Sequence, residues 1–123
     1  MPAAREASFS LGKSKRLTRS TDFARVRTDG RTIRGELMML GIFVSDSPQP
    51  FRAGFVTSRR VGSAVVRNRV RRRLREIVRL HQNELRQDLW IVIIARAEAA
   101  QASYTELRDE WLRLVKRASI LAP

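Results

Sequence analysis

A long amphipathic segment in the second half of the chain constrains the fold most. From about Ser63 to Arg86 the apolar residues recur at helical spacing within an arc of about 100°, the width of a stripe that faces a core. They are Val66, Val70, Leu74, Ile77, His81 and Leu85. The opposite side carries Asn68, Arg71, Arg72, Arg75 and Arg79. This pattern predicts a helix that packs by one face and offers guanidinium groups on the other.

Two further helices are predicted on either side of that segment. The first is expected to be capped by Ser20 or Thr21 and to end at Gly30. The last opens with a capping box from Ser103 to Glu106 and continues with apolar residues at helical spacing.

Three apolar runs predict strands, at residues 36–45, 52–58 and 89–95. Residues 45–50, Ser-Asp-Ser-Pro-Gln-Pro, favour chain reversal, so the first two strands are expected to form an antiparallel hairpin. The run 89–95 is apolar throughout, which indicates a strand covered on both faces. The order helix, strand, strand, helix, strand, helix predicts a single α+β domain in which three helices pack on a mixed central sheet. Splitting the first apolar run would add one further strand.

The domain is expected over residues 16–118, between a flexible N-terminal arm at 1–15 and a tail at 119–123. In the arm, Phe9 and Leu11 are candidate tethers. No apolar run reaches the roughly 18 residues that span a bilayer, and the first ten residues lack the apolar stretch of a signal peptide. The absence of Cys excludes disulfides and thiolate chemistry. A cytoplasmic protein without a membrane partner is therefore expected.

Positive charge is concentrated in one window. The chain carries a net charge of +13, and residues 59–79 hold nine arginines and a single acid, Glu76. Like charges at this density repel one another unless a polyanion neutralises them, so the window predicts a binding face for a polyanion, either nucleic acid or an anionic membrane surface. The alternative, a solvated basic helix stabilised by ion pairs, would need more acids than Glu76.

The candidate RNA-binding surface combines this helix with the loop before it. Gly62 allows close backbone approach, Ser63 can cap the helix, and the helix N-terminus favours a phosphate. Asn68 can hold an arginine in place or read a base or 2′-hydroxyl. The candidate residues are Arg59, Arg60, Gly62, Arg67, Asn68, Arg69, Arg71, Arg72, Arg75 and Arg79.

No catalytic constellation is evident in the sequence. His81 is interpreted as a core-edge histidine with a hydrogen-bond partner. Asp109 and Glu110 are neighbours that point in different directions, and they are interpreted as solvated residues that Arg108 or Arg113 can pair. The acids are too scattered to suggest a two-metal site. We therefore expect no cofactor on the protein alone, and expect any associated reaction to be carried by a partner.

Residues 59–76, Arg-Arg-Val-Gly-Ser-Ala-Val-Val-Arg-Asn-Arg-Val-Arg-Arg-Arg-Leu-Arg-Glu, resemble the signature of the protein subunit of bacterial ribonuclease P. The resemblance extends from Arg16 to about Val115. It includes Arg-Leu-Thr-Arg-Ser-Thr-Asp-Phe at 16–23, Ile-Val-Ile-Ile-Ala-Arg at 91–96 and Tyr-Thr-Glu-Leu at 104–107. It implies a ribonucleoprotein endonuclease whose RNA subunit, with Mg²⁺, removes 5′ leaders from precursor tRNA while the protein assists.

The resemblance also implies partners and residue roles. The partners are the ribonuclease P RNA and precursor tRNA with its single-stranded 5′ leader, and no protein oligomer is required. Arg60, Gly62, Arg67, Asn68, Arg72 and Arg75 would contact the catalytic RNA. Arg16 and Phe23 would line a leader cleft, with Arg27 where relatives often have an aromatic residue. A left-handed strand-helix-strand crossover is implied as well, against the general right-handed rule.

Alternative interpretations stay open at the level of sequence. Phe23 is equally consistent with an ordinary core residue between helix and sheet. The charge pattern also fits a protein that binds ribosomal RNA as a structural clamp or assembly factor. A third alternative is an autonomous metal-dependent nuclease.

Overall fold

The computed structural model describes residues 15–44 and 50–122. The predicted arm up to residue 14 and most of the predicted turn, residues 45–49, lie outside the described residues. The helices are α2 (Ser20–Asp29), α3 (Ala64–His81) and α4 (Tyr104–Ala118), and the strands are β1 (Arg31–Arg34), β2 (Met38–Val44), β3 (Arg52–Val56) and β4 (Leu89–Ala95). Short 3-10 turns span Arg59–Val61, Gln82–Glu84 and Ala97–Gln101. In the described ranges no helix is long and apolar enough to cross a membrane.

The four strands form one mixed sheet in the order β1-β2-β4-β3. β4 runs antiparallel to β2 and parallel to β3. The predicted hairpin between residues 36–45 and 52–58 is therefore wrong, because β4 lies between these two strands. A strand that is apolar at every position gains most from burial at the centre of the sheet, and this outweighs the pairing of sequence neighbours.

The hairpin in the structure is formed by β1 and β2, which pair antiparallel. β1 is the further strand that the sequence left open, so the element order is helix, three strands, helix, strand, helix. It precedes the apolar run instead of arising from a split within it. Its charged, exposed residues Arg31 and Arg34 gave no strand signal in the sequence.

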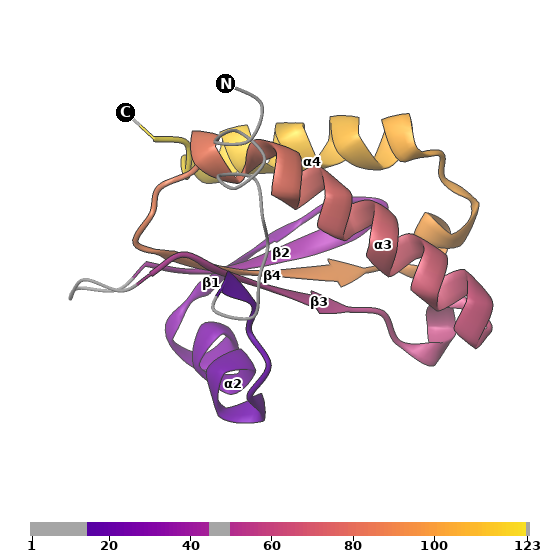
Figure 1. The fold of residues 1–123 in the computed structure, drawn as a ribbon, viewed down its shortest axis with the longest axis horizontal. Coiled ribbons are helices and arrows are strands. Elements are labelled where there is room, and N and C mark those ends of the chain that lie inside the picture. Colours follow the sequence, from indigo (N-terminus) through magenta and orange to yellow (C-terminus); the bar gives the residue numbers. More distant parts are fainter. Residues whose placement is uncertain (1–14, 45–49, 123) are drawn as a thin grey trace, which may run out of the picture.

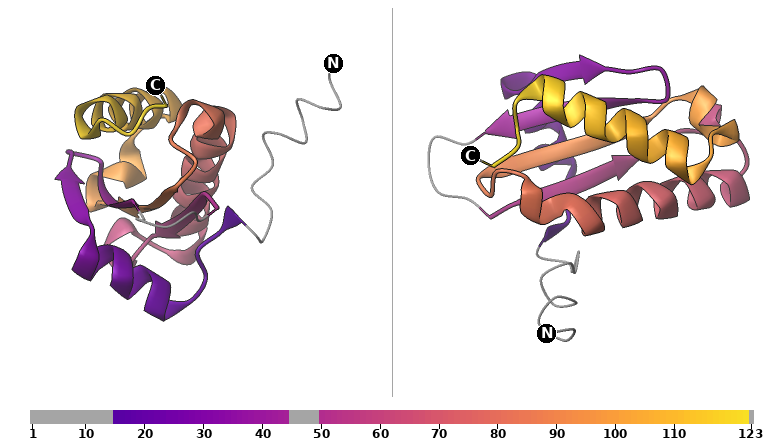
Figure 2. Two further views of the ribbon diagram at one scale, coloured as in Figure 1. Left: turned by 90° about the vertical axis from the view of Figure 1, so that its left-hand side faces the viewer. Right: turned by 90° about the horizontal axis from the view of Figure 1, so that it is seen from above.

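The two faces of the sheet are covered by different helices. α3 and α4 lie over one face, and α2 lies under the other (Figure 1). Figure 2 shows from above how α3 and α4 cover the sheet. The larger core, between the sheet and α3 and α4, includes Met38, Leu40, Ile42, Leu74, Ile77, Ile91, Ile93, Leu107 and Trp111. The smaller cluster under α2 consists of Leu17, Val26, Trp90 and Val92, with Phe23, Phe43 and Ile94 packed against it.

The N-termini of the helices follow local sequence signals in two of three cases. Ser63 caps α3, since its hydroxyl accepts from the Val66 amide at 3.4 Å, and α4 has the predicted capping box. The predicted cap of α2 at Ser20 or Thr21 is wrong. That helix begins at Ser20 with Arg19 as its N-cap, and no side chain caps it. The Leu17 amide donates to the Ala53 carbonyl at 2.9 Å, and this pairing along β3 fixes where the chain turns into α2.

Glu110 is buried, with 4% of its surface exposed, so its interpretation as a solvated residue is wrong. Its carboxylate accepts from the backbone amides of Glu36, Leu37 and Met38, at 3.0, 2.7 and 3.0 Å. These three donors replace the water that the carboxylate loses on burial. Glu110 thereby fastens α4 to the turn between β1 and β2. Asp109 is exposed and pairs with Arg108 at 3.2 Å, as predicted.

Replacing Glu110 by Gln should lower the free energy of unfolding by about 1–3 kcal/mol. The change retains the shape of the side chain but directs an NH₂ group toward backbone donors. The measurement is urea denaturation, with Asp109→Asn as a control that should stay within about 0.5 kcal/mol of the wild type. Equal midpoints for Glu110→Gln and wild type would contradict the role given to this carboxylate.

Candidate nucleic-acid interface

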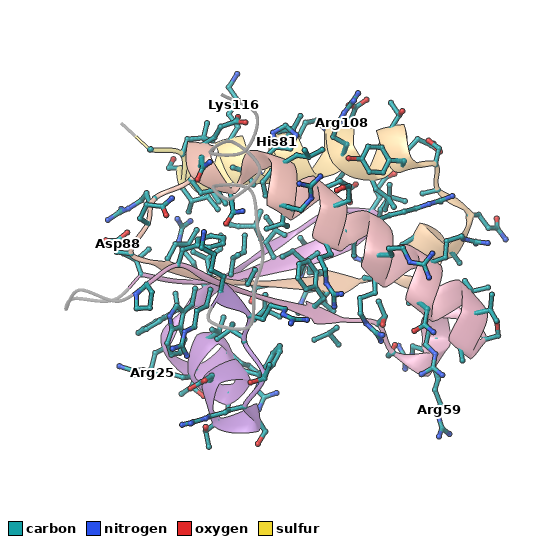
Figure 3. All side chains as sticks on the ribbon, viewed as in Figure 1. Arg25, Arg59, His81, Asp88, Arg108 and Lys116 are labelled. Carbon is teal, nitrogen blue, oxygen red and sulfur yellow. The ribbon has the colours of Figure 1, made fainter. Side chains whose placement is uncertain are left out.

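The loop before α3 presents two exposed arginines on a fixed backbone. Val61, which is buried, anchors the turn at Arg59–Val61, while Arg59 and Arg60 are exposed. Figure 3 shows Arg59 extending away from the fold. Gly62 has a φ of 146°, which side chains rarely adopt, and a Cβ there would lie 3.1 Å from Val66. The sequence suggests that Gly62 allows close backbone approach to a partner. The structure shows in addition that the positive φ at this position favours glycine.

Several arginines on the loop and on α3 carry unpaired charge. Within the described residues, no hydrogen bond or ion pair is made by the side chains of Arg59, Arg60, Arg67 and Arg72. Arg71 is held by neutral groups, donating to Asn68 Oδ1 at 3.1 Å and to Thr57 Oγ1 at 2.5 Å. Asn68 thus positions an arginine, one of the two roles considered from the sequence. Because its partners are uncharged, Arg71 keeps its full charge for an anion.

Two of the candidate RNA-binding residues, Arg69 and Arg79, make internal contacts that leave fewer donors for RNA. Arg69 donates to the Ala100 carbonyl at 2.8 Å, beside Arg73, which donates to the Ala102 carbonyl at 2.9 Å. Both side chains fasten α3 to the segment before α4. Arg79 binds the Glu76 carboxylate, with a closest distance of 2.6 Å. Its charge is therefore offset within the helix.

Arg16 and Arg75 both lie against β3. Arg16 pairs with Ala53 in an isolated bridge, and the Arg75 guanidinium lies 5.9 Å from the centre of the Phe55 ring. The Nε atoms of both arginines are buried without a hydrogen-bond partner. Burial, together with the charges of Arg16 and Arg71, lowers the pKa of Arg75 from its ordinary value. A bound anion would relieve this repulsion between positive charges.

A hollow of about 220 Å³ lies between α2 and the sheet. Phe23 and Arg27 lie one turn apart on α2 and form its wall, and the sheet contributes an apolar floor that includes Val92 and Ile94. The structure thus brings Phe23 and Arg27 together as predicted. Arg16 does not line this hollow and pairs instead with Ala53 of β3.

Phe23 is both a packing residue and a wall of the hollow. A Cβ on Gly54 would lie 2.6 Å from Phe23 Cε1, so the ring rests directly on the β3 backbone. The side chain is only half-buried, however, and the remaining surface faces the hollow. The two sequence interpretations of Phe23 are therefore compatible.

His81 has the predicted structural environment. Its Nδ1 lies 2.9 Å from Glu84 Oε2, and its ring centre is 5.6 Å from that of Trp111. α3 ends at His81, earlier than the predicted Arg86. Across residues 15–44 and 50–122, no group of three His, Asp or Glu side chains is arranged to hold a metal ion.

Sequence reasoning missed the aromatic residues that arginines cover. Phe43 and Trp90 contact edge to face under α2, with ring centres 5.9 Å apart. The Arg25 guanidinium lies 4.9 Å from the Phe43 ring centre, and that of Arg52 lies 5.5 Å from the Trp90 ring centre. Side chains alternate between the two faces of a strand, but every residue from 89 to 95 is apolar. The sequence therefore did not show on which face Trp90 lies.

Comparisons with known proteins identify one family. The profile of the family described as Ribonuclease P matches residues 11–119. The "Ribonuclease P protein component" of Symbiobacterium thermophilum is 38% identical over 111 residues, covering 90% of this chain and 96% of that protein. The protein of the same description from Acidothermus cellulolyticus is 45% identical over 103 residues, covering 83% and 86%. The solved structure of Staphylococcus aureus RNase P protein has the same fold, with a TM-score of 0.81, 24% identity and coverage of 89% and 100%.

Replacing Gly54 by Ala should lower the free energy of unfolding by about 1–3 kcal/mol, because the new methyl group displaces the Phe23 ring. Thermal or urea unfolding measures the change. The double variant Gly54→Ala with Phe23→Ala should lose less than the sum of the two single variants. Additive losses would mean that Phe23 does not rest on Gly54.

Proposed function

Since the chain belongs to the ribonuclease P protein family, we propose that it assists 5′ maturation of precursor tRNA through two RNA-binding surfaces on opposite faces of its sheet. The RNA subunit performs the hydrolysis. The observation that carries the proposal is the row of arginines on α3 and its preceding loop whose charges no carboxylate among the described residues offsets.

The α3 surface is proposed to bind the catalytic RNA. Arg59 and Arg60 on the loop, and Arg67 and Arg72 on α3, have unpaired guanidiniums suited to phosphates. Arg71 is already oriented by Asn68 and Thr57, so it loses little side-chain freedom on binding. Arg16, whose charge helps to lower the pKa of Arg75, is assigned to this surface as well. Arg69 and Arg79 contribute through the donors that their internal contacts leave available.

The hollow under α2 is proposed to hold the single-stranded 5′ leader. Its apolar floor suits the flat face of a base, and the half-buried Phe23 ring provides a surface for stacking. Arg27, one turn further along α2, supplies a cation for the leader backbone, or for stacking where relatives have an aromatic residue.

We also infer that β3, α3 and β4 form a left-handed crossover. The right-hand view of Figure 2 supports this sense. There α3 lies between the viewer and the sheet, β3 and β4 both run from left to right, and β4 lies above β3. The crossover carries α3 over the face opposite α2. This crossover thereby places the surface proposed for the RNA subunit and the hollow proposed for the leader on opposite faces of the sheet.

The partners in this proposal are the ribonuclease P RNA and precursor tRNA, in the cytoplasm. Mg²⁺ is the expected cofactor of the RNA-catalysed hydrolysis. The described residues have no cluster of metal-binding side chains, so the proposal gives them no role in holding the ion.

Reconstitution tests the proposed function. Adding the protein to its cognate RNA at low Mg²⁺ should increase precursor tRNA cleavage or substrate affinity, because the arginines offset phosphate repulsion that Mg²⁺ otherwise screens. Protein alone with RNA and Mg²⁺ should cleave nothing. No gain from the added protein would reject the proposal.

Replacing Arg72 by Ala should weaken binding to the RNA subunit and reduce the slope of log affinity against log salt by about one unit, since one phosphate contact is lost. The measurement is a filter-binding titration at several salt concentrations. Lys116→Ala removes the same charge from the exposed surface of α4 and should leave the slope unchanged. Equal slopes for Arg72→Ala and wild type would place Arg72 outside the interface.

Replacing Phe23 by Ala should weaken binding of leader-containing precursor tRNA to the holoenzyme by about 1–3 kcal/mol if the ring stacks on a base. Affinity for mature tRNA, which lacks the leader, should not change. Phe23→Leu separates the two roles, because it retains apolar packing without an aromatic face. If Phe23→Leu binds the leader as well as wild type does, the ring serves packing alone.

A further inference from the structure

A second basic surface lies at the corner between β1 and α4, away from the α3 arginines. A hollow of about 480 Å³ opens there between the β1–β2 turn and the helix. Its lining residues are Arg34, Gly35, Glu36, Glu110, Arg113, Leu114 and Arg117. Neither the α3 surface nor the α2 hollow includes Arg113 or Arg117.

The arginines at this corner keep their charge. Arg113 and Arg34 have no side-chain hydrogen bond or ion pair within the described residues. Arg117 donates to the Arg34 carbonyl at 2.6 Å, and a carbonyl does not neutralise a guanidinium. Glu110 is turned inward, where three backbone amides occupy its oxygens. Glu36 is the one exposed acid among the lining residues.

A further hollow lies between this corner and the α2 hollow. This third hollow, of about 390 Å³, shares Ile94 with the α2 hollow and Arg34 with the corner. Arg60 and Arg96 line it, and Arg96 also donates to the Gly35 carbonyl at 3.2 Å, across the β1–β2 turn. The three hollows together form a candidate track, lined by Arg27, then by Arg96 and by Arg60, which also belongs to the α3 surface, then by Arg34, Arg113 and Arg117. The middle hollow is also lined by the exposed acid Glu98.

The chemistry changes along this track. The α2 hollow offers an aromatic ring and an apolar floor, which suit bases. The corner offers guanidiniums beside a polar turn and no aromatic ring among its lining residues, which suits phosphates alone. Proteins that bind single-stranded nucleic acids commonly combine aromatic side chains, on which bases stack, with a positively charged groove that follows the phosphate backbone.

We propose that the β1–α4 corner binds the phosphate backbone of the upstream part of the leader, beyond the nucleotides held under α2. The inference rests on the proposed function, because it extends the track that the leader would occupy. It predicts that affinity continues to rise with leader length after the α2 hollow is filled, and that the further gain depends on salt.

The test uses reconstituted holoenzyme and precursor tRNAs whose leaders range from about 4 to about 16 nucleotides. Arg113→Gln should weaken binding of the longest leaders by about two- to five-fold and leave the shortest unchanged. Lys116→Gln is the matched control, since Lys116 has the same charge but points away from the sheet (Figure 3). Glu36→Gln should strengthen binding of long leaders, because it removes the exposed acid.

Two results would overturn the proposal. One is no difference between Arg113→Gln and Lys116→Gln at any leader length. The other is an equal penalty on substrates with and without a leader, which would place the corner against the RNA subunit or the tRNA body. Failure of the proposed function is a separate outcome, because the wild-type protein would then add nothing to the RNA.

Cross-linking supplies a direct second measurement. The chain has no Cys, so Arg113→Cys creates a unique attachment point for a photoreactive group. Cross-links to upstream leader nucleotides are expected from this position and not from Lys116→Cys. Cross-links from Arg113→Cys that reach only the RNA subunit would overturn the proposal.

Discussion

Burial of both faces of β4 is the constraint on which the rest of the structure depends. Six of the seven residues from Leu89 to Ala95 are buried, so water has to be excluded above and below the strand. β2 and β3 flank it, α3 and α4 cover one face, and α2 covers the other. This arrangement leaves an outer surface on each helical layer. The two proposed RNA-binding surfaces therefore lie on opposite sides of one central strand.

Several arginines of this chain are held by groups that carry no charge. Arg69 and Arg73 donate to carbonyls before α4, Arg117 donates to the carbonyl of Arg34, and Arg71 donates to a hydroxyl and an amide. Such contacts fix a guanidinium without cancelling its field. Ion pairs would fix it too, but each pair would remove one positive charge from the surface. The Arg79–Glu76 pair shows that alternative on the same helix.

Patterns within a few residues of one another were sufficient to predict much of the fold. The bounds of β4, the capping box of α4, the core-edge position of His81 and the arginine face of α3 all depend on local spacing. The sheet order was missed because it depends on which strand gains most from burial, a comparison across the whole chain. Glu110 was missed because its three donors lie more than seventy residues away. The position of Arg16 likewise depends on a bridge to Ala53.

The contacts of Glu110 also bear on how the chain folds. They join residues separated by 72 to 74 positions, and β4 enters the sheet between two strands made much earlier. β2 can pair with β1 early, but its second neighbour and the strand neighbour of β3 are both β4, which is synthesised later. The β1–β2 turn is not fastened until α4 follows. Closing such long loops slows folding. During synthesis, apolar side chains of the first half of this protein therefore stay exposed to water until β4 and α4 have been made and the sheet is complete.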